Sequence, residues 1–245
     1  MMSVAELLLG DSRFPAGGHA HSGGVEPAVT AGTVTDTGTL ELFLRGRLQT
    51  AGLVAAGIAA AACAHARAGQ DAASSLAGRH GNDERGQSPE LVADDFWAEL
   101  DAEADARTPA PAQREASRRQ GRALLRTARV AWPDAVWPAS LVRPHHAVVL
   151  GAAAAAAGCE PGEAARIAAY QAVAGAVSAA VRLLALDPMR ATGVLAGLTG
   201  EIDQIAARGA AYADGPLGDL PCASAPALDL LAETHVRAEV RLFES

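Results

Sequence analysis

Residues 144–188, PHHAVVLGAAAAAAGCEPGEAARIAAYQAVAGAVSAAVRLLALDP, decide the class of fold. Alanine is the commonest residue in this stretch, and it has the highest helix propensity of all residues. No run alternates between apolar and polar residues as a half-buried strand would. We therefore predict helices at about 145–157 and 162–186, separated by Gly158. Asp187-Pro188 suits an N-cap followed by a first-turn proline, so another helix begins there.

Helical patterns continue outward from this stretch in both directions. The whole chain is 50% hydrophobic but only 4% aromatic, which suits close helix packing better than a sheet of β-branched residues. We expect one all-α, multi-helix bundle over residues 1–245, interrupted by a polar linker at about 70–88. The further helices are expected at about 39–67, from Ser88-Pro89-Glu90 through Leu100, and at about 111–129, 188–208 and 226–242.

The charged residues exclude several classes of function. The chain has no lysine, and both a Walker-type phosphate loop and a Schiff-base enzyme need one. The net charge of −8 argues against a general nucleic-acid-binding protein. Arginines do cluster between residues 114 and 129, mostly at three- and four-residue spacing along one side of a helix. We interpret this side as a solvated or ion-pairing face.

The cysteines and the apolar stretches indicate a cytoplasmic protein. Cys63, Cys159 and Cys222 are odd in number and widely separated, so they imply neither a disulfide framework nor a zinc site. The N-terminus lacks the basic region of a signal peptide. The alanine-rich stretches at 51–64 and 147–157 are too short and too weakly apolar to span a bilayer.

A glycine-rich segment at about 10–24 carries the first candidate site. His19 and His21 could offer two imidazoles to a metal ion, but no nearby Cys, Asp or Glu completes a known spacing. We favour a tight turn that Asp11, Ser12, His21 and Ser22 hold by hydrogen bonds. Near the other end, His235 and Glu239 lie on one helical face. No catalytic centre, cofactor site or dinucleotide fingerprint is visible in the sequence.

Three motifs resemble those of the UreF family of urease accessory proteins. The run LLGDSRFPAGGHAHSGGVE at 8–26 is similar to the family pattern L-x-D-S-x-F-P-x-G-x-x-x-H-S-x-G-x-E. The run REASRRQGRALL at 114–125 resembles its R-x-A-S-x-x-x-G-x-x-L segment. Val181-Arg182-Leu183, His235 and RLFES at 241–245 resemble its later landmarks, in family order.

This resemblance implies a non-enzymatic helical protein that forms a homodimer. It further implies that the chain binds UreD, also called UreH, recruits the GTPase UreG, and helps deliver nickel to apo-urease without a cofactor of its own. The N-terminal segment and a tail at about 235–245 would dock on partners and become ordered on binding. The implied partner-binding residues are Asp11, Ser12, Phe14, Pro15, His21, Ser22, Glu26, Arg114, Ser117, Gly121, Arg182, His235, Arg241, Leu242, Phe243 and Ser245.

Three alternatives to a pure assembly factor stay open at this point. The chain could activate the partner GTPase by supplying Arg13 or Arg241 to the transferring phosphoryl group. It could carry nickel directly on His19, His21 and His235. It could also be a helical hydrolase, although the sequence gives no positive support for that activity.

Overall fold

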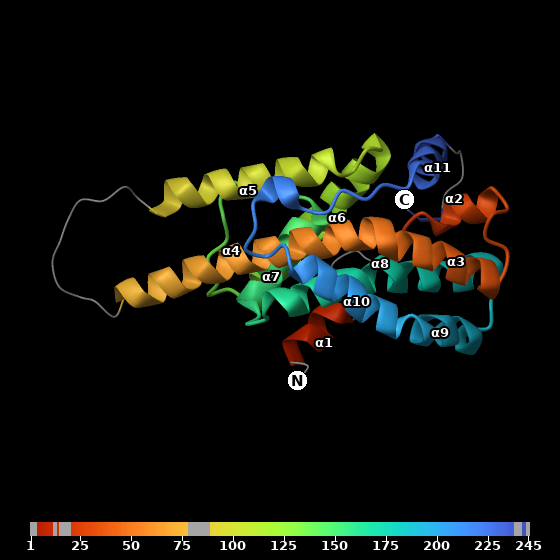
Figure 1. Ribbon diagram of the computed structural model, residues 1–245, viewed down its shortest axis with the longest axis horizontal. Helices are drawn as coiled ribbons and strands as arrows, with labels where there is room; N and C mark the ends of the chain where they lie inside the picture. The colour runs from red at the N-terminus through yellow and green to blue at the C-terminus, as the bar shows by residue number, and fades with distance from the viewer. Residues whose placement is uncertain (1–3, 12–13, 15–20, 78–88, 238–241, 244–245) are drawn as a thin grey trace.

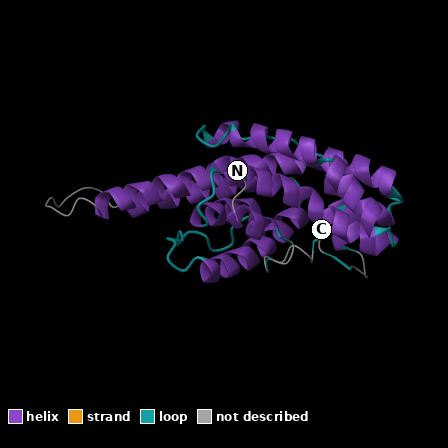
Figure 2. Cartoon of the chain, turned by 90° about the horizontal axis from the view of Figure 1, so that it is seen from below, coloured by secondary structure: helices purple, strands orange, loops and turns teal. Residues whose placement is uncertain are grey.

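The computed structural model describes residues 4–11, 14, 21–77, 89–237 and 242–243, and within this part of the chain it confirms the all-α prediction. The described residues form helices and no strand, as Figure 2 shows. The α-helices are α1 (Val4–Gly10), α2 (Val25–Thr30), α3 (Thr37–Arg47), α4 (Leu53–Ala77), α5 (Pro89–Ala106), α6 (Pro111–Ala131), α7 (His146–Ala156), α8 (Pro161–Leu184), α9 (Pro188–Gly197), α10 (Thr199–Ala210) and α11 (Pro226–Val236). A π-helical turn, Leu48–Gly52, joins α3 to α4, and a short 3-10 turn covers Leu217–Asp219.

Helix α4 runs through the middle of the molecule, between α5 and α6 on one side and α9 and α10 on the other (Figure 1). It contributes to two apolar clusters. Ile58 and Ala62 pack in the cluster that α4 shares with α7 and α6. Ala56 and Ala60 pack in the cluster that α4 shares with α8 and α10. Small side chains on both faces of α4 explain how two layers of helix can lie so close to it.

The crossing of α4 and α7 depends on a glycine. A Cβ atom placed on Gly151 would lie 2.3 Å from the carbonyl oxygen of Ala59 and 2.5 Å from the Cβ of Ala62. Real side chains do not approach a neighbouring backbone so closely, so only glycine fits there. The alanines around it are fully buried, and this close contact makes α7 part of the core.

Local sequence patterns placed several helices correctly. The helices expected at 111–129, 145–157 and 162–186 are present as α6, α7 and α8 with small shifts at their ends. Asp187 is the N-cap of α9, since its side chain accepts a hydrogen bond from the amide of Met189 at 2.9 Å, and Pro188 occupies the first turn. This part of the prediction is confirmed.

Three expected boundaries were wrong. The helix expected at 188–208 breaks at Leu198, whose side chain is buried and which has Gly197 before it and Gly200 two residues after it. The helix expected at 226–242 ends at Val236. The expected linker at 70–88 is helical as far as Ala77, because its first residues are good helix formers without glycine or proline. Residues 78–88 lie outside the described part of the chain.

Two helical stretches are long and apolar enough to cross a membrane, Thr37–Ala72 and Pro161–Leu184. The structure thus joins the stretch at 51–64, which by itself is too short to span a bilayer, into a longer continuous helix. In the most apolar window of Thr37–Ala72, 67% of the residues are buried inside the molecule. A core helix of a water-soluble protein passes the same test of length and composition, so neither stretch is more than weak evidence for a membrane.

Candidate docking site

The structure brings together residues that lie far apart in the sequence, around the end of the chain. Glu26 from α2, Arg182 from α8 and His235 from α11 surround Leu242 and Phe243, which follow α11. We call these five residues the tail clamp. All five are among the residues that the motif resemblance implied, although their contacts span up to 217 positions along the chain.

Glu26 holds the backbone of the tail. Its Oε1 accepts a hydrogen bond from the amide of Leu242 at 2.7 Å, and its Oε2 accepts one from the amide of Phe243 at 2.8 Å. The residue is only 6% exposed, and hydrogen bonds to a buried carboxylate are stronger than those between neutral groups. His235 Nε2 lies 3.4 Å from Oε2 of Glu26 and 3.3 Å from the carbonyl oxygen of Phe243. The carboxylate therefore fixes both the direction of the tail and the imidazole beside it.

The two described tail residues have opposite environments. The ring of Phe243 is buried, and the guanidinium carbon of Arg182 lies 4.6 Å from the ring centroid in a cation–π contact. The side chain of Leu242 is 68% exposed. In this conformation Phe243 anchors the tail to its own chain, and Leu242 is free to meet another molecule. Arg241 and Ser245 lie outside the described residues.

In the N-terminal segment, the described residues mostly face inward. Phe14 is buried in the core, with its ring centroid 6.1 Å from that of Trp132. Ser22 is also buried, and its carbonyl oxygen accepts the amide of Val25 at 3.2 Å. Asp11 closes a turn by accepting the amide of Phe14 at 3.0 Å. Ser12, Arg13, Pro15 and His19 are outside the described part of the chain, so only His21 of the two loop histidines can be placed.

The motif on α6 holds the start of α7. A Cβ atom on Gly121 would lie 2.2 Å from the carbonyl oxygen of Pro144, so the backbone of the preceding loop lies directly on this glycine. One turn earlier, the Ser117 hydroxyl accepts the amide of His146 at 3.1 Å and lies 3.0 Å from Nδ1 of His145. We call residues 144–146 together with Ser117 and Gly121 the α6–α7 corner. These contacts give Ser117 and Gly121 a structural role, since both hold the backbone that leads into α7.

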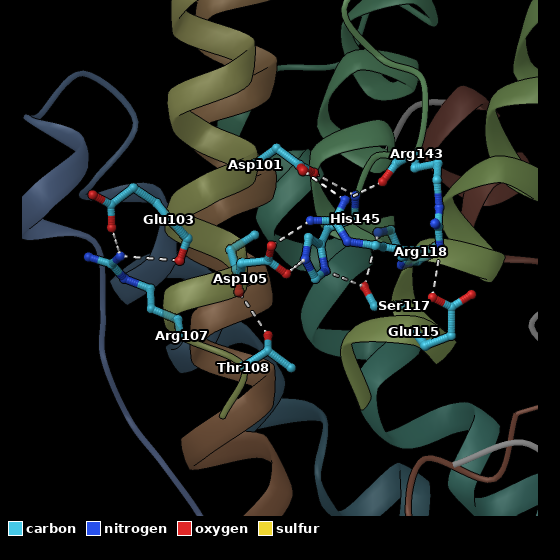
Figure 3. Close-up of polar contacts among 12 residues, drawn as sticks. Asp101, Glu103, Asp105, Arg107, Thr108, Glu115, Ser117, Arg118, Arg143 and His145 are labelled. Atoms are coloured by element: carbon cyan, nitrogen blue, oxygen red, sulfur yellow. Dashed lines mark hydrogen bonds and ion pairs between the residues drawn. The ribbon is translucent and has the colours of Figure 1, made fainter. Parts of the chain in front are cut away.

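A charged network surrounds this corner, as Figure 3 shows. Nε2 of His145 lies 2.7 Å from Asp105, and the amide of His145 donates to Asp101 at 2.8 Å. Arg118 binds Asp101 at 2.8 Å and Asp105 at 2.7 Å. Burial lowers the pKa of His145, so the imidazole is neutral near pH 7. Burial by itself would raise the pKa of Asp105, but hydrogen bonds from His145 and Arg118 outweigh it and lower this pKa.

Ser117 contacts His145, and His145 contacts Asp105, as serine, histidine and carboxylate do in a hydrolytic triad. The other contacts of these residues nevertheless suit a structural role. The Ser117 hydroxyl is already used by the amide of His146, which leaves this amide unable to stabilise an oxyanion. Asp105 is shared with Arg118, and His145 is only 2% exposed. No sequence motif pointed to Asp101, Asp105 and His145. The four-residue spacing of the two aspartates on α5 was the only available hint.

Within the described part of the chain, the remaining predicted positions form no metal site. No group of three or more His, Cys, Asp or Glu in the described residues could hold a metal ion. His235 is part of the tail clamp, whereas His21 lines a cavity. Arg114 is half-buried beside a surface hollow that Glu115 and Arg143 also line. Ion pairing on α6, one of the two predicted roles of its arginines, is present at Arg118.

Replacing Ser117 with alanine is expected to lower the free energy of unfolding by about 1–2 kcal/mol, because the amide of His146 would lose its partner. Urea unfolding monitored by circular dichroism measures this change. Ser178→Ala is the matched control, since the Ser178 hydroxyl is exposed on α8 and bonds only its own helix at 3.2 Å. Equal losses in both variants would contradict a specific role for Ser117.

Comparisons with known proteins agree with the motif resemblance. The family model described as UreF matches residues 34–199. A urease accessory protein UreF of Mycolicibacterium vanbaalenii is 43% identical over 246 residues, which cover 100% of both chains. Proteins of the same description from Mycobacterium marinum and Mycobacterium tuberculosis are 43% and 44% identical, also over the full length of both chains. The similarity to these relatives therefore covers the whole tail clamp, whereas only Arg182 of the clamp lies within the segment matched by the family model.

Proposed function

Because the chain belongs to the UreF family of urease accessory proteins, we propose that it is a non-enzymatic assembly factor for the nickel centre of urease. In this proposal it binds UreD (UreH), recruits the GTPase UreG, and presents both to apo-urease. The chain supplies surface and geometry, while the nucleotide chemistry belongs to the partner. Nickel is the cargo of the assembly and not a resident cofactor of this chain.

The tail clamp is the observation that supports this proposal most directly. Glu26 fixes the tail so that the apolar side chain of Leu242 faces outward, 68% exposed. On the neighbouring helix α11, Leu230 is 70% exposed and Val236 is 46% exposed. Exposed apolar side chains next to a rigidly held backbone are typical of a protein-binding surface. We assign this surface to UreD.

Other parts of the proposal have more general support. Cys63, Cys159 and Cys222 form no disulfide, and only Cys222 is exposed, which agrees with a reducing compartment such as the cytoplasm. Burial raises the pKa of the Cys63 thiol to about 12, so this thiol is not reactive. Homodimerisation comes from the family resemblance alone.

The test is capture of UreD and UreG by the tagged chain, with and without GTP, followed by determination of the size of any complex. We expect a stable ternary complex. Failure of both proteins to bind under gentle conditions would reject the assembly role.

Replacing Leu242 with aspartate is expected to weaken capture of UreD about tenfold or more, because a charge would have to be desolvated in an apolar contact. Val136→Asp is the matched control, since Val136 is 87% exposed and lies outside the clamp. The dissociation constants of both variants for UreD can be compared by surface plasmon resonance. Equal affinity of the two variants would place the UreD surface elsewhere.

A further inference from the structure

A cavity of about 230 Å³ lies between α4, α6, α7, α8 and α11. The apolar side chains of Val54, Ile58 and Leu150 form part of its wall, and the charged side chain of Arg47 lines it as well. Its volume is several times that of a water molecule. We propose that this cavity binds a small oxyanion of the phosphate class, anchored by the guanidinium of Arg47.

Arg47 is the first reason for this assignment. Its Nε donates to the carbonyl oxygen of Ala172 at 2.7 Å, but no carboxylate of a described residue lies within ion-pair distance of it. Burial lowers the pKa of Arg47 to about 10, so the group is still charged near pH 7. A partly buried charge without a counter-charge is costly. Arg107, which lines the same cavity, differs because Glu103 neutralises it.

The backbone around Arg47 is shaped to hold its side chain in place. The π-helical turn Leu48–Gly52 begins immediately after it, and such turns inside helices are frequent at functional sites. On the other side, Gly23 has a φ of +60°, and a Cβ atom there would lie 3.1 Å from Nε of Arg47. The guanidinium therefore rests against a bare peptide. The two Nη groups of Arg47 donate to no described residue, so they are available to a ligand.

Two further polar residues, His146 and Gln171, line the cavity. Nε2 of His146 and Oε1 of Gln171 are buried, and neither has a hydrogen-bond partner among the described residues. Burial, and then the nearby His21, lower the pKa of His146 to about 4, so its imidazole is neutral near pH 7. Buried polar atoms are nearly always paired, with protein, water or ligand. Oε1 of Gln171 only accepts hydrogen bonds, so of these two atoms it is Nε2 of His146, in its N–H tautomer, that can donate to an oxyanion.

The charges that line the cavity favour an anion over a cation. Asp229 is the one carboxylate among the described lining residues, and it forms no ion pair with Arg47. Burial raises the pKa of Asp229, which weakens its tendency to be charged. A planar guanidinium with two free Nη groups matches two oxygens of one oxyanion. A divalent cation such as nickel would meet the charge of Arg47 instead.

The test measures the thermal unfolding of the full chain with increasing phosphate, at an ionic strength held constant with chloride. We expect a saturable rise in Tm of about 3 °C or more at ten times the Kd. The titration stays in the low millimolar range because concentrated phosphate stabilises most proteins without binding a site. In Arg47→Gln this rise is expected to vanish. Arg190→Gln is the control, because Arg190 is 80% exposed on α9, outside the cavity, and this variant should respond like the parent protein.

A second measurement on the unmodified chain does not depend on how the variants fold. An oxyanion in the cavity should raise the pKa of His146 from about 4, which imidazole NMR signals followed against pH would show. An equal rise in Tm in the parent and in Arg47→Gln, or an unchanged pKa of His146 with saturating phosphate, would overturn the proposal. The inference uses only this chain, so it stands or falls independently of the proposed function.

Discussion

Replacing Gly121 with alanine is expected to lower the free energy of unfolding by about 3 kcal/mol, at the upper end of the cost of inserting atoms into a packed site. The added methyl group would lie 2.2 Å from the carbonyl oxygen of Pro144, 3.0 Å from the carbonyl carbon of His145 and 3.1 Å from the amide nitrogen of His146. These are backbone atoms, which the hydrogen bonds of His145 and His146 hold in place. The helix cannot accommodate the change by moving one side chain.

Gly193→Ala is the matched control for this prediction. Gly193 also lies inside a helix, α9, but no heavy atom would be within 4 Å of an added Cβ. Alanine has a higher helix propensity than glycine, so this variant should be more stable by about 0.5–1 kcal/mol. The two glycine-to-alanine changes therefore have opposite expected signs. Urea unfolding of both variants measures them, and a stability of Gly121→Ala close to that of the parent would contradict the contact at the α6–α7 corner.

This corner also shows what sequence analysis could not reach. Ser117 and Gly121 lie four residues apart on α6, so both are on one face of the helix. The family resemblance implied that both residues contact a partner, which stays a prediction, and the structure adds that both contact residues 144–146 of their own chain. Local patterns identify a helical face but carry no information about which distant segment covers it. Tertiary contacts supply that information.

The fold itself followed more closely from the sequence. Helices α8 and α9 both begin with a proline in the first turn after an acidic N-cap residue, so local sequence determines where they start. At the start of α8, the side chains of Glu160 and Glu163 form a capping box. The break at Leu198 was harder to predict, because isolated glycines are tolerated inside helices. Its cause is tertiary, since Leu198 is fully buried among the neighbouring helices.

The residues of the tail clamp could be identified from the sequence, whereas Arg47 could not. The members of the clamp belong to motifs near the two ends of the chain and at 181–183, so the sequence pointed to the residues but not to their convergence. Arg47 belongs to no motif and lies in an ordinary helical pattern. That no carboxylate of a described residue pairs with it becomes apparent only from the three-dimensional arrangement. The spacing of residues along the chain does not show which charged side chains pair between distant segments of the fold.

The last prediction concerns Glu26, whose carboxylate carries the clamp. Glu26→Gln keeps the shape of the side chain but replaces one acceptor oxygen with an amide that donates. One tail amide, of Leu242 or Phe243, would then face another donor, and the other would lose its charged acceptor. Hydrogen bonds to a charged group are worth about 1.5–3 kcal/mol each, so release of the tail should become easier by about 3 kcal/mol. This change corresponds to amide hydrogen exchange at Leu242 and Phe243 that is about 100-fold faster.

Glu41→Gln provides the control, because Glu41 is half-exposed on α3 and pairs only with Arg45 at 2.9 Å, so its loss should cost less than about 1 kcal/mol. Capture of UreD by the same variants then separates two roles of the clamp. If Glu26→Gln speeds exchange at the tail and also weakens capture, the held tail is the docking element, because releasing it restores the entropy that binding must remove. If exchange speeds up but capture is unchanged, the clamp serves only the stability of this chain and UreD binds another surface. Unchanged exchange would show that Glu26 does not hold the tail, because nothing else in the clamp accepts those two amides among the described residues.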